Sequence, residues 1–424
     1  MRLRLAALLT AALVLAGVST PAFAASGSAP GAPAASGFVP VSPTRVLDTR
    51  NSAANCAENS TLQSDSFSDV ELALCAGHMP PTPVWSVPAG ATAVVVNVTA
   101  TDASADTYLS IGAPGTFTQA SPPAFSTLNV SPGHDVANLV TVALGPDADG
   151  ENAGVAGLTL YNHAGSVDVV LDVLGYYMPP SQTTTTYRYT PIQPARALDT
   201  RQQQVPLGPG AQQVVQVNGL PGIPADAAAL VVTLTATDAT TRSFLTVTPV
   251  GVQQTTSTVN YEPGKDVSNQ AIVPVSGSGS SIAVDNHAGS VDAVLDVVGY
   301  YSTDGQALFT PVPPSRILDT RTGSGPLGAN AALPLAVAGH GGVPTGAIGA
   351  VLNLTATQET QPSHLIVWPA GQPVPGTSSL NTNPSTDIAE HVQTRLGSAG
   401  AVDIYNHAGS TQVIADVYGY FTAP

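Results

Sequence analysis

The stretch NHAGSVDVVLDVLGYY, Asn162–Tyr177, occurs three times in this 424-residue chain and decides which fold the sequence predicts. The second copy, Asn286–Tyr301, differs at two positions, and the third, Asn406–Phe421, differs at six. In each copy, Asn and Gly supply a turn, and an apolar β-branched run supplies the strand that follows. The sequence therefore predicts a triplication in which every unit ends in a buried strand.

Each unit opens with an aromatic residue, a proline two residues later, and the motif RxLDTR. These openings span Phe38–Arg50, Tyr189–Arg201 and Phe309–Arg321. Between opening and closing, short apolar runs alternate with Gly, Pro, Asn and Asp, and no segment has the 3.6-residue period of a helix. Ala93–Thr101 is expected to be a strand with alternate residues, Val94 to Ala100, on its buried face.

These signals predict an all-β protein made of three tandem antiparallel β-sandwich domains, Ig-like or jelly-roll-like, after a signal peptide. The first unit is longer than the others because it carries an insertion near its start. The expected parts are a signal peptide at 1–24, a linker at 25–37, and repeats at 38–178, 187–301 and 308–424.

The first 24 residues have the pattern of a secretory signal. Arg2 and Arg4 precede the apolar run from Leu5 to Val18, and small residues surround a cleavage site after Ala24. No later segment is long and apolar enough to span a membrane. We expect a secreted protein without a transmembrane segment in the mature chain. Its Cys56 and Cys75, both in the insertion of the first repeat, are expected to form a disulfide.

Composition excludes several classes of function. Only 9% of residues are charged, and 12 Lys and Arg stand against 28 Asp and Glu, which gives a net charge of −16. Nucleic-acid binding needs clustered basic residues, so it is not expected. The chain has no GxSxG, HExxH or dinucleotide-binding motif. We therefore expect a protein that is not an enzyme and has no cofactor.

The ordered motifs RxLDTR, NVTAT and NxAGS…DVxGYY/F resemble an extracellular repeat module of actinobacteria. The resemblance covers nearly all of residues 38–424. It implies an all-β secreted module, suspected of attachment to the cell envelope or to polysaccharide, without catalytic residues. In such modules an aromatic residue often precedes the proline of the third strand block. Here only Trp368 supplies it, because Gly112 and Thr248 occupy the matching positions.

The Arg and Asp residues of the openings are the clearest chemical feature. Six of the ten basic residues that follow the signal lie there. An aspartate also recurs inside each closing strand, where an unpaired carboxylate is costly. We expect an Arg–carboxylate network that clamps the first strand of a repeat to its last; the alternative is recognition of an anionic ligand. The network comprises Arg45, Asp48, Arg50, Asp172, Arg196, Asp199, Arg201, Asp296, Arg316, Asp319, Arg321 and Asp416.

The NHAGS turns carry one histidine each, which has three possible roles. It is held by backbone groups of the turn, it contacts a ligand with the preceding asparagine, or it binds a metal. No second histidine lies at metal-ligand spacing, so no metal site is expected. The candidate ligand-binding residues are Asn162, His163, Asn286, His287, Asn406, His407 and Trp368.

Two further loop patterns occur, of which the first recurs in all three units and the second is found once. Asn129–Asp135, Asn260–Asp266 and Asn381–Asp387 contain a proline and end in aspartate, which is typical of a hairpin loop and also offers hydrogen bonds to a sugar. Asp147–Asn152 resembles half of a calcium loop, and a solvated acidic turn is the simpler interpretation.

The sequence as a whole predicts a secreted, non-catalytic repeat protein that binds cell-wall glycan or another polysaccharide multivalently. The alternative is a structural spacer or adhesin-like stalk that contacts proteins. Exposed aromatic residues distinguish the two, because sugars stack on them, and the chain has only two tryptophans, Trp85 and Trp368.

Overall fold

A computed structural model describes residues 33–51, 60–72, 87–146, 156–183, 185–252, 256–275, 281–384 and 386–424. Several expectations concern residues outside these ranges: the signal peptide 1–24, most of the linker 25–37, the pair Cys56 and Cys75, Trp85, and the acidic turn Asp147–Asn152. No described helix is long and apolar enough to cross a membrane.

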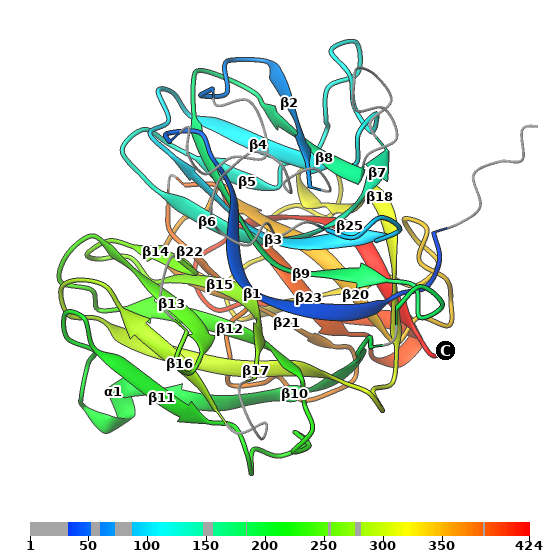
Figure 1. Cartoon of the computed structure of the whole chain (residues 1–424). Helices are drawn as coiled ribbons and strands as arrows, with labels where there is room; N and C mark the ends of the chain where they lie inside the picture. The colour runs from blue at the N-terminus through cyan, green and yellow to red at the C-terminus, as the bar shows by residue number, and fades with distance from the viewer. Residues whose placement is uncertain are drawn as a thin grey trace, which may run out of the picture. The chain divides into compact units, whose positions relative to one another are not determined.

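The described chain is all-β in small antiparallel sheets, as predicted (Figure 1). Repeat 1 contains β1 (Gly37–Asp48), β2 (Ser66–Glu71), β3 (Ala93–Thr101), β4 (Thr107–Gly112), β5 (Leu128–Val130), β6 (Val136–Ala143), β7 (Gly145–Pro146), β8 (Ala156–Asn162) and β9 (Asp168–Met178). Repeat 2 contains β10 (Arg188–Asp199), α1 (Thr200–Gln203), β11 (Gln212–Gln216), β12 (Ala229–Thr237), β13 (Ser243–Pro249), β14 (Val259–Tyr261), β15 (Val267–Pro274), β16 (Ser281–Asn286) and β17 (Asp292–Ser302). Repeat 3 contains β18 (Leu308–Asp319), η3 (Thr320–Thr322), β19 (Ala331–Ala336), β20 (Gly349–Thr357), β21 (Ser363–Pro369), β22 (Leu380–Thr382), β23 (Ile388–Arg395), η4 (Ser398–Gly400), β24 (Ala401–Asn406) and β25 (Gln412–Thr422).

Each repeat contributes two sheets with the same strand order. The first sheet joins the opening strand to the closing strand, in the orders β1-β9-β3-β6, β10-β17-β12-β15 and β18-β25-β20-β23. The second sheet has the orders β2-β8-β4-β5, β11-β16-β13-β14 and β19-β24-β21-β22, with β7 added beside β8. The repeated sequence motifs thus specify a repeated pairing scheme.

The aromatic residue of each opening explains why the closing motif contains a glycine. In repeat 1, the ring of Phe38 lies on Gly175, whose cross-strand partner is Pro40, and a Cβ added to Gly175 would lie 2.3 Å from that ring. The same contact recurs between Tyr189 and Gly299, where a Cβ would lie 2.4 Å from the ring. Only a residue without a side chain lets the ring lie on the strand at this point.

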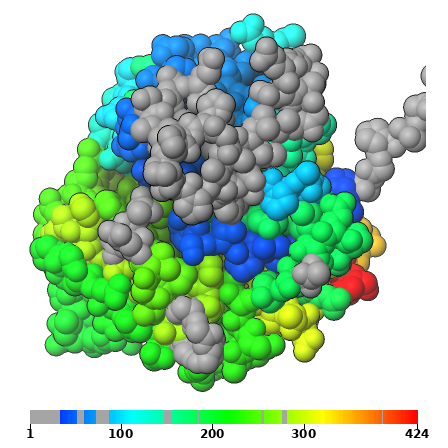
Figure 2. Space-filling view, in the orientation of Figure 1, coloured from blue at the N-terminus to red at the C-terminus, as the bar shows by residue number. Residues whose placement is uncertain are grey.

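The prediction of three separate sandwich domains is wrong. The six sheets form a propeller-like ring, in which β6, β15 and β23 contact one another. Contacts of β6 with β14, of β15 with β22, and of β23 with β5 link each repeat to the next in a closed cycle. In the space-filling view, the blue β1 segment of repeat 1 lies directly against the green surface of repeat 2 (Figure 2).

Burial gives the physical reason for this difference. All nine residues of β3 are buried, as are all nine of β12 and of β20, although one buried face was expected. A strand buried on both faces has a second layer of protein over it, and here neighbouring repeats contribute to that layer. The core of repeats 1 and 2 is accordingly continuous, and it extends to Tyr418 and Phe421 of repeat 3.

Aromatic residues join the repeats at one end of the first sheets. The opening aromatic of each repeat packs on a closing aromatic of another: Phe38 on Tyr301 at 4.5 Å, Tyr189 on Phe421 at 4.5 Å, and Phe309 on Tyr177 at 4.3 Å between ring centroids. All six rings are fully buried. These six aromatic residues therefore hold the repeats together and are not exposed for stacking on a sugar.

A layer of buried polar side chains lies farther along the contact of β6, β15 and β23. Asn138 accepts a hydrogen bond from the backbone N–H of His391 at 2.8 Å, and Asn269 accepts one from that of Leu139 at 2.9 Å. Repeat 3 has Glu390 at the corresponding position, where its Oε2 accepts a hydrogen bond from Ser268 at 2.8 Å. Its other oxygen, Oε1, is buried and has no hydrogen-bond partner among the described residues.

Because repeat 3 has Glu390 where the other repeats have asparagine, we predict that the stability of the protein depends on pH. Burial raises the pKa of Glu390 well above its usual value, so the folded protein keeps the carboxyl protonated. The unfolded chain ionises it above about pH 4.3, so the wild type loses up to about 1.4 kcal/mol of stability per pH unit up to the folded pKa. Glu390→Gln removes this loss. We expect its advantage in Tm over the wild type to grow from pH 4 to pH 7; a constant difference would contradict the assignment.

Candidate functional site

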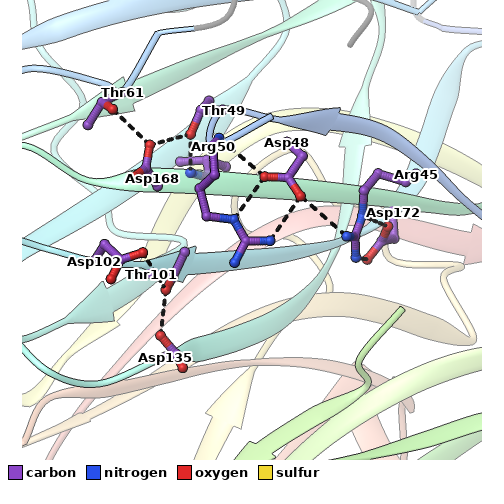
Figure 3. A network of polar contacts seen from close by, with 11 residues as sticks. Arg45, Asp48, Thr49, Arg50, Thr61, Thr101, Asp102, Asp135, Asp168 and Asp172 are labelled. Carbon is purple, nitrogen blue, oxygen red and sulfur yellow. Dashed lines mark hydrogen bonds and ion pairs between the residues drawn. The ribbon is translucent and has the colours of Figure 1, made fainter. Parts of the chain in front are cut away.

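The Arg and Asp residues of each opening form one compact network with the closing strand. In repeat 1, Arg45 binds Asp172 through two hydrogen bonds, Nε to Oδ1 at 2.9 Å and Nη2 to Oδ2 at 3.2 Å (Figure 3). These residues are direct cross-strand partners in β1 and β9. Arg45 also contacts Asp48 at 3.3 Å, and Arg50 donates two hydrogen bonds to Asp48, both 2.9 Å long. The structure thus places the predicted residues together.

The same network recurs in the other repeats. Arg196 Nε lies 2.6 Å from Asp296, and Arg316 Nε lies 3.0 Å from Asp416. Asp199 and Asp319 each accept a hydrogen bond from the backbone N–H two residues later, that of Arg201 or Arg321. The hydrogen bond from Arg201 is the largest contribution to a lowered pKa of Asp199, about 2. The arginines remain partly exposed, which leaves N–H groups for other partners.

The three asparagines of the NHAGS turns are engaged within the protein. Asn162 is buried; its amide donates to the carbonyls of Leu62, Gln63 and Gly165 at 2.9–3.3 Å. Its oxygen accepts a hydrogen bond from Thr107 at 2.8 Å. The amides of Asn286 and Asn406 donate to the matching carbonyls of their own repeats. These side chains hold the turn and offer no free amide hydrogen to a ligand.

The three histidines beside them are exposed and stacked. His163 lies on Tyr108 with centroids 4.5 Å apart, His287 on Phe244 at 4.6 Å, and His407 on His364 at 4.7 Å. Trp368 differs, because it is 4% exposed and its Nε1 donates to the carbonyl of Gln372 at 2.9 Å. Trp368 therefore offers no stacking surface, whereas the histidine pairs do.

A cleft between repeats 2 and 3 brings several of these motifs together. Its volume is about 520 Å³. Repeat 2 contributes Arg196 and Arg201 of the opening, Thr235 and Thr237 of β12, and Asp266. Repeat 3 contributes His364, His407, Tyr405, Asn381 and the segment 374–378. The sequence singled out the opening, the NHAGS turn and the Asn381–Asp387 loop separately, and the fold joins them across a repeat boundary.

Two buried polar groups in this cleft lack partners. Asn381 is 9% exposed and Thr235 is 7% exposed. Neither Asn381 Nδ2 nor Thr235 Oγ1 has a hydrogen-bond partner among the described residues. A buried donor without an acceptor costs about 1–3 kcal/mol, so such a group in a cleft points to a bound ligand or water.

The unpartnered groups recur at the equivalent positions of the other repeats. Asn129 Nδ2 and Asn260 Nδ2 also lack partners in the described structure, as does Thr99 Oγ1. Thr99 and Asn260 stand at the sequence positions that match Thr235 and Asn381, whereas Thr355, the matching residue of repeat 3, is not among the unpartnered groups. Sequence reasoning marked the three asparagines as turn residues and missed the threonines, because a threonine in a strand carries no distinctive signal.

The charges in the cleft are close to balanced. Arg196 Nη2 donates to the carbonyl of Gly376 at 3.1 Å, a bond that crosses from repeat 2 to repeat 3. Asp266 lines the same cleft, and the hydrogen bond with Asp199, with a smaller contribution from Asp266, raises the pKa of Arg201. Burial lowers the pKa of His364, with a smaller contribution from His407, so His364 favours the neutral form. No group of three or more potential metal ligands occurs in the described part of the chain.

Comparisons with known proteins add little to this description of the site. No family model and no curated protein match the chain. A solved chain described with the triple jelly roll fold and turret assembly of an archaeal virus has 9% identity and a TM-score of 0.17, over 92% of this chain and 90% of that one. A chain of Sulfolobus turreted icosahedral virus has 8% identity and a TM-score of 0.16, over 91% and 90%. Likenesses at these TM-scores carry no argument about fold or function.

Proposed function

We propose that the protein is a secreted, non-catalytic, multivalent binding protein for a cell-envelope or other polysaccharide, with sugar residues bound in the clefts between repeats. The observation that carries the proposal is the unpartnered pair Asn381 Nδ2 and Thr235 Oγ1 in the cleft. Sugar hydroxyl groups both donate and accept hydrogen bonds, so they satisfy an amide and a hydroxyl at once.

The rest of the cleft suits the same ligand class. Arg201 and Asp266 offer charged hydrogen-bonding groups, and the stacked pair of His364 and His407 offers a flat surface beside Tyr405. Because the motifs recur, equivalent sites between repeats 1 and 2 and between repeats 3 and 1 would give three sites per chain. Weak sites that act together raise the apparent affinity for a polymer.

The stalk alternative has less support. A spacer is usually a linear array in which repeats contact only their neighbours in sequence. Here β23 of repeat 3 contacts β5 and β6 of repeat 1, so the repeats close on themselves. A closed arrangement of the repeats brings their binding sites together, whereas a spacer needs an extended arrangement.

The test is co-sedimentation of residues 25–424 with purified bacterial cell walls and insoluble polysaccharides at two salt concentrations. Asn381→Ala removes an unpartnered amide, so we expect unchanged or raised Tm together with binding weakened about fivefold, since one hydrogen bond contributes about 1 kcal/mol. The combined change of Asn129, Asn260 and Asn381 to Ala is expected to abolish sedimentation.

The matched control is Gln216→Ala, which removes an exposed amide on β11 outside the cleft and is expected to leave binding intact. Wild-type protein that stays in the supernatant with every wall and polysaccharide would refute the proposal. Equal binding by the wild type and the triple variant would refute the assignment of the clefts.

A further inference from the structure

A second cavity lies where the three recurring loops meet. It is lined by the same loop in each repeat, at His134, Lys265 and Thr386. Its volume is about 90 Å³, and one water needs only about 10–15 Å³ on this measure, so there is room for a small organic ligand. Val136, Val267 and Ile388, the first residues of β6, β15 and β23, form its apolar lining. We call it the axial pocket.

Basic groups gather at one side of the axial pocket. Lys265 is the only lysine of the chain. It lies 2.5 Å from Glu262, His134 lies 3.0 Å from the same carboxylate, and Arg242 lies 3.6 Å from it. One carboxylate has two oxygens, and Arg242 also donates to the carbonyl of Gly133, whereas a lysine and an arginine together carry eight N–H donors. Donors therefore remain for a further acceptor.

The other polar groups reinforce this excess of donors. Asn129 and Asn260 also line the axial pocket, and their side-chain nitrogens are buried without hydrogen-bond partners in the described structure. Asp135 lies there too, but it accepts a hydrogen bond from Thr101 at 2.6 Å. Asp387, from repeat 3, is the remaining acid of the lining. A donor-rich side next to an apolar lining matches a ligand with an acceptor-rich head and an apolar body.

We infer that the axial pocket binds a small carboxylate with a short apolar chain through Lys265 and Arg242, neither of which lines the cleft between repeats 2 and 3. The chain lies against Val136, Val267 and Ile388, and the carboxylate binds Lys265 and Arg242. The head has a single position, because the residue that matches Lys265 is His134 in repeat 1 and Thr386 in repeat 3. Glu262 competes for the same cations, so it limits the affinity.

The test measures binding of hexanoate to residues 25–424 by titration calorimetry, with acetate and 1-hexanol as ligands that lack the chain or the charge. We expect saturable binding of hexanoate only, weakened at least tenfold in the double variant Lys265→Met, Arg242→Met. The control Arg395→Met removes an exposed arginine outside the axial pocket and is expected to leave binding unchanged.

Glu262→Gln is expected to change the affinity for hexanoate in the opposite direction. It removes the competing carboxylate, so affinity for hexanoate is expected to rise severalfold, which misfolding would not produce. Absence of saturable binding, equal affinity for hexanoate and hexanol, or wild-type affinity in the double variant would each overturn the inference. These results do not depend on whether the protein sediments with polysaccharide. Failure of hexanoate binding is therefore distinguishable from failure of the proposed polysaccharide binding.

Discussion

Tyr301→Ala is expected to destabilise all three repeats at once. Tyr301 is fully buried, its ring packs on Phe38 of repeat 1, and its hydroxyl lies 2.5 Å from that of Tyr177 and 2.9 Å from the amide of Gln393 in repeat 3. Loss of a buried aromatic side chain costs about 3–5 kcal/mol. Because the side chain contacts both other repeats, the cost falls on their association as well as on repeat 2.

Urea unfolding followed by hydrogen exchange resolves where the stability is lost. We expect amides of β3, β12 and β20 to lose protection together. The control is Tyr300→Ala, which removes the adjacent, partly exposed tyrosine, and Tyr301→Phe isolates the contribution of the hydroxyl. Loss of protection confined to repeat 2 would show that the repeats unfold independently and would contradict the shared core.

The repeated motifs predict the strands well and their association poorly. The opening and closing strands pair as predicted, and in each pair the arginine of the opening lies directly across from the aspartate inside the closing strand. The local sequence pattern does not indicate what covers the second face of Ala93–Thr101. A strand buried by its own repeat and a strand buried by its neighbour have the same sequence signature, so separate sandwiches were the natural and mistaken prediction.

The polar residues of β6, β15 and β23 carried the missing information. Asn138, Asn269 and Glu390 interrupt apolar strands at equivalent positions, and each is at most 2% exposed. A buried amide needs a partner, and a strand at the edge of a sandwich does not supply one. Each asparagine donates one hydrogen bond within its own repeat and another to a different repeat, as with the bond from Asn269 to Asn97 at 2.9 Å. Polar interruptions at matching positions therefore indicate contact between repeats.

The candidate site was predicted in parts. Arg196 and Arg201 of the second opening and His407 of the third NHAGS turn line the cleft between repeats 2 and 3. The asparagines of the same turns and Trp368 serve the fold, because their polar hydrogens are engaged by backbone carbonyls. From sequence alone a conspicuous polar residue is equally compatible with both roles, and only the hydrogen-bond partners distinguish them.

Asp172→Ala is the second change with a large expected effect. It removes the bidentate partner of Arg45 and leaves that guanidinium with Asp48 alone. Asp172 is 1% exposed, whereas the side chain of Arg45 is 28% exposed. Breaking a buried ion pair costs about 3–5 kcal/mol, and partial solvation of the arginine reduces this to about 2–3 kcal/mol. We expect a clear loss of Tm, checked by calorimetry against the exposed control Asp106→Ala.

A double-mutant cycle separates the two roles considered for this network. If the pair clamps β1 to β9, removal of Arg45 and Asp172 together costs much less than the sum of the single changes, because the double variant leaves no unpaired charge. If Arg45 is held ready for an anionic ligand, Asp172→Ala leaves Tm unchanged and alters binding alone. Arg45 and Asp172 are direct cross-strand partners, and the same pairing recurs at Arg196 and Arg316. That recurrence in three strand pairs favours the clamp, and the coupling energy measures it.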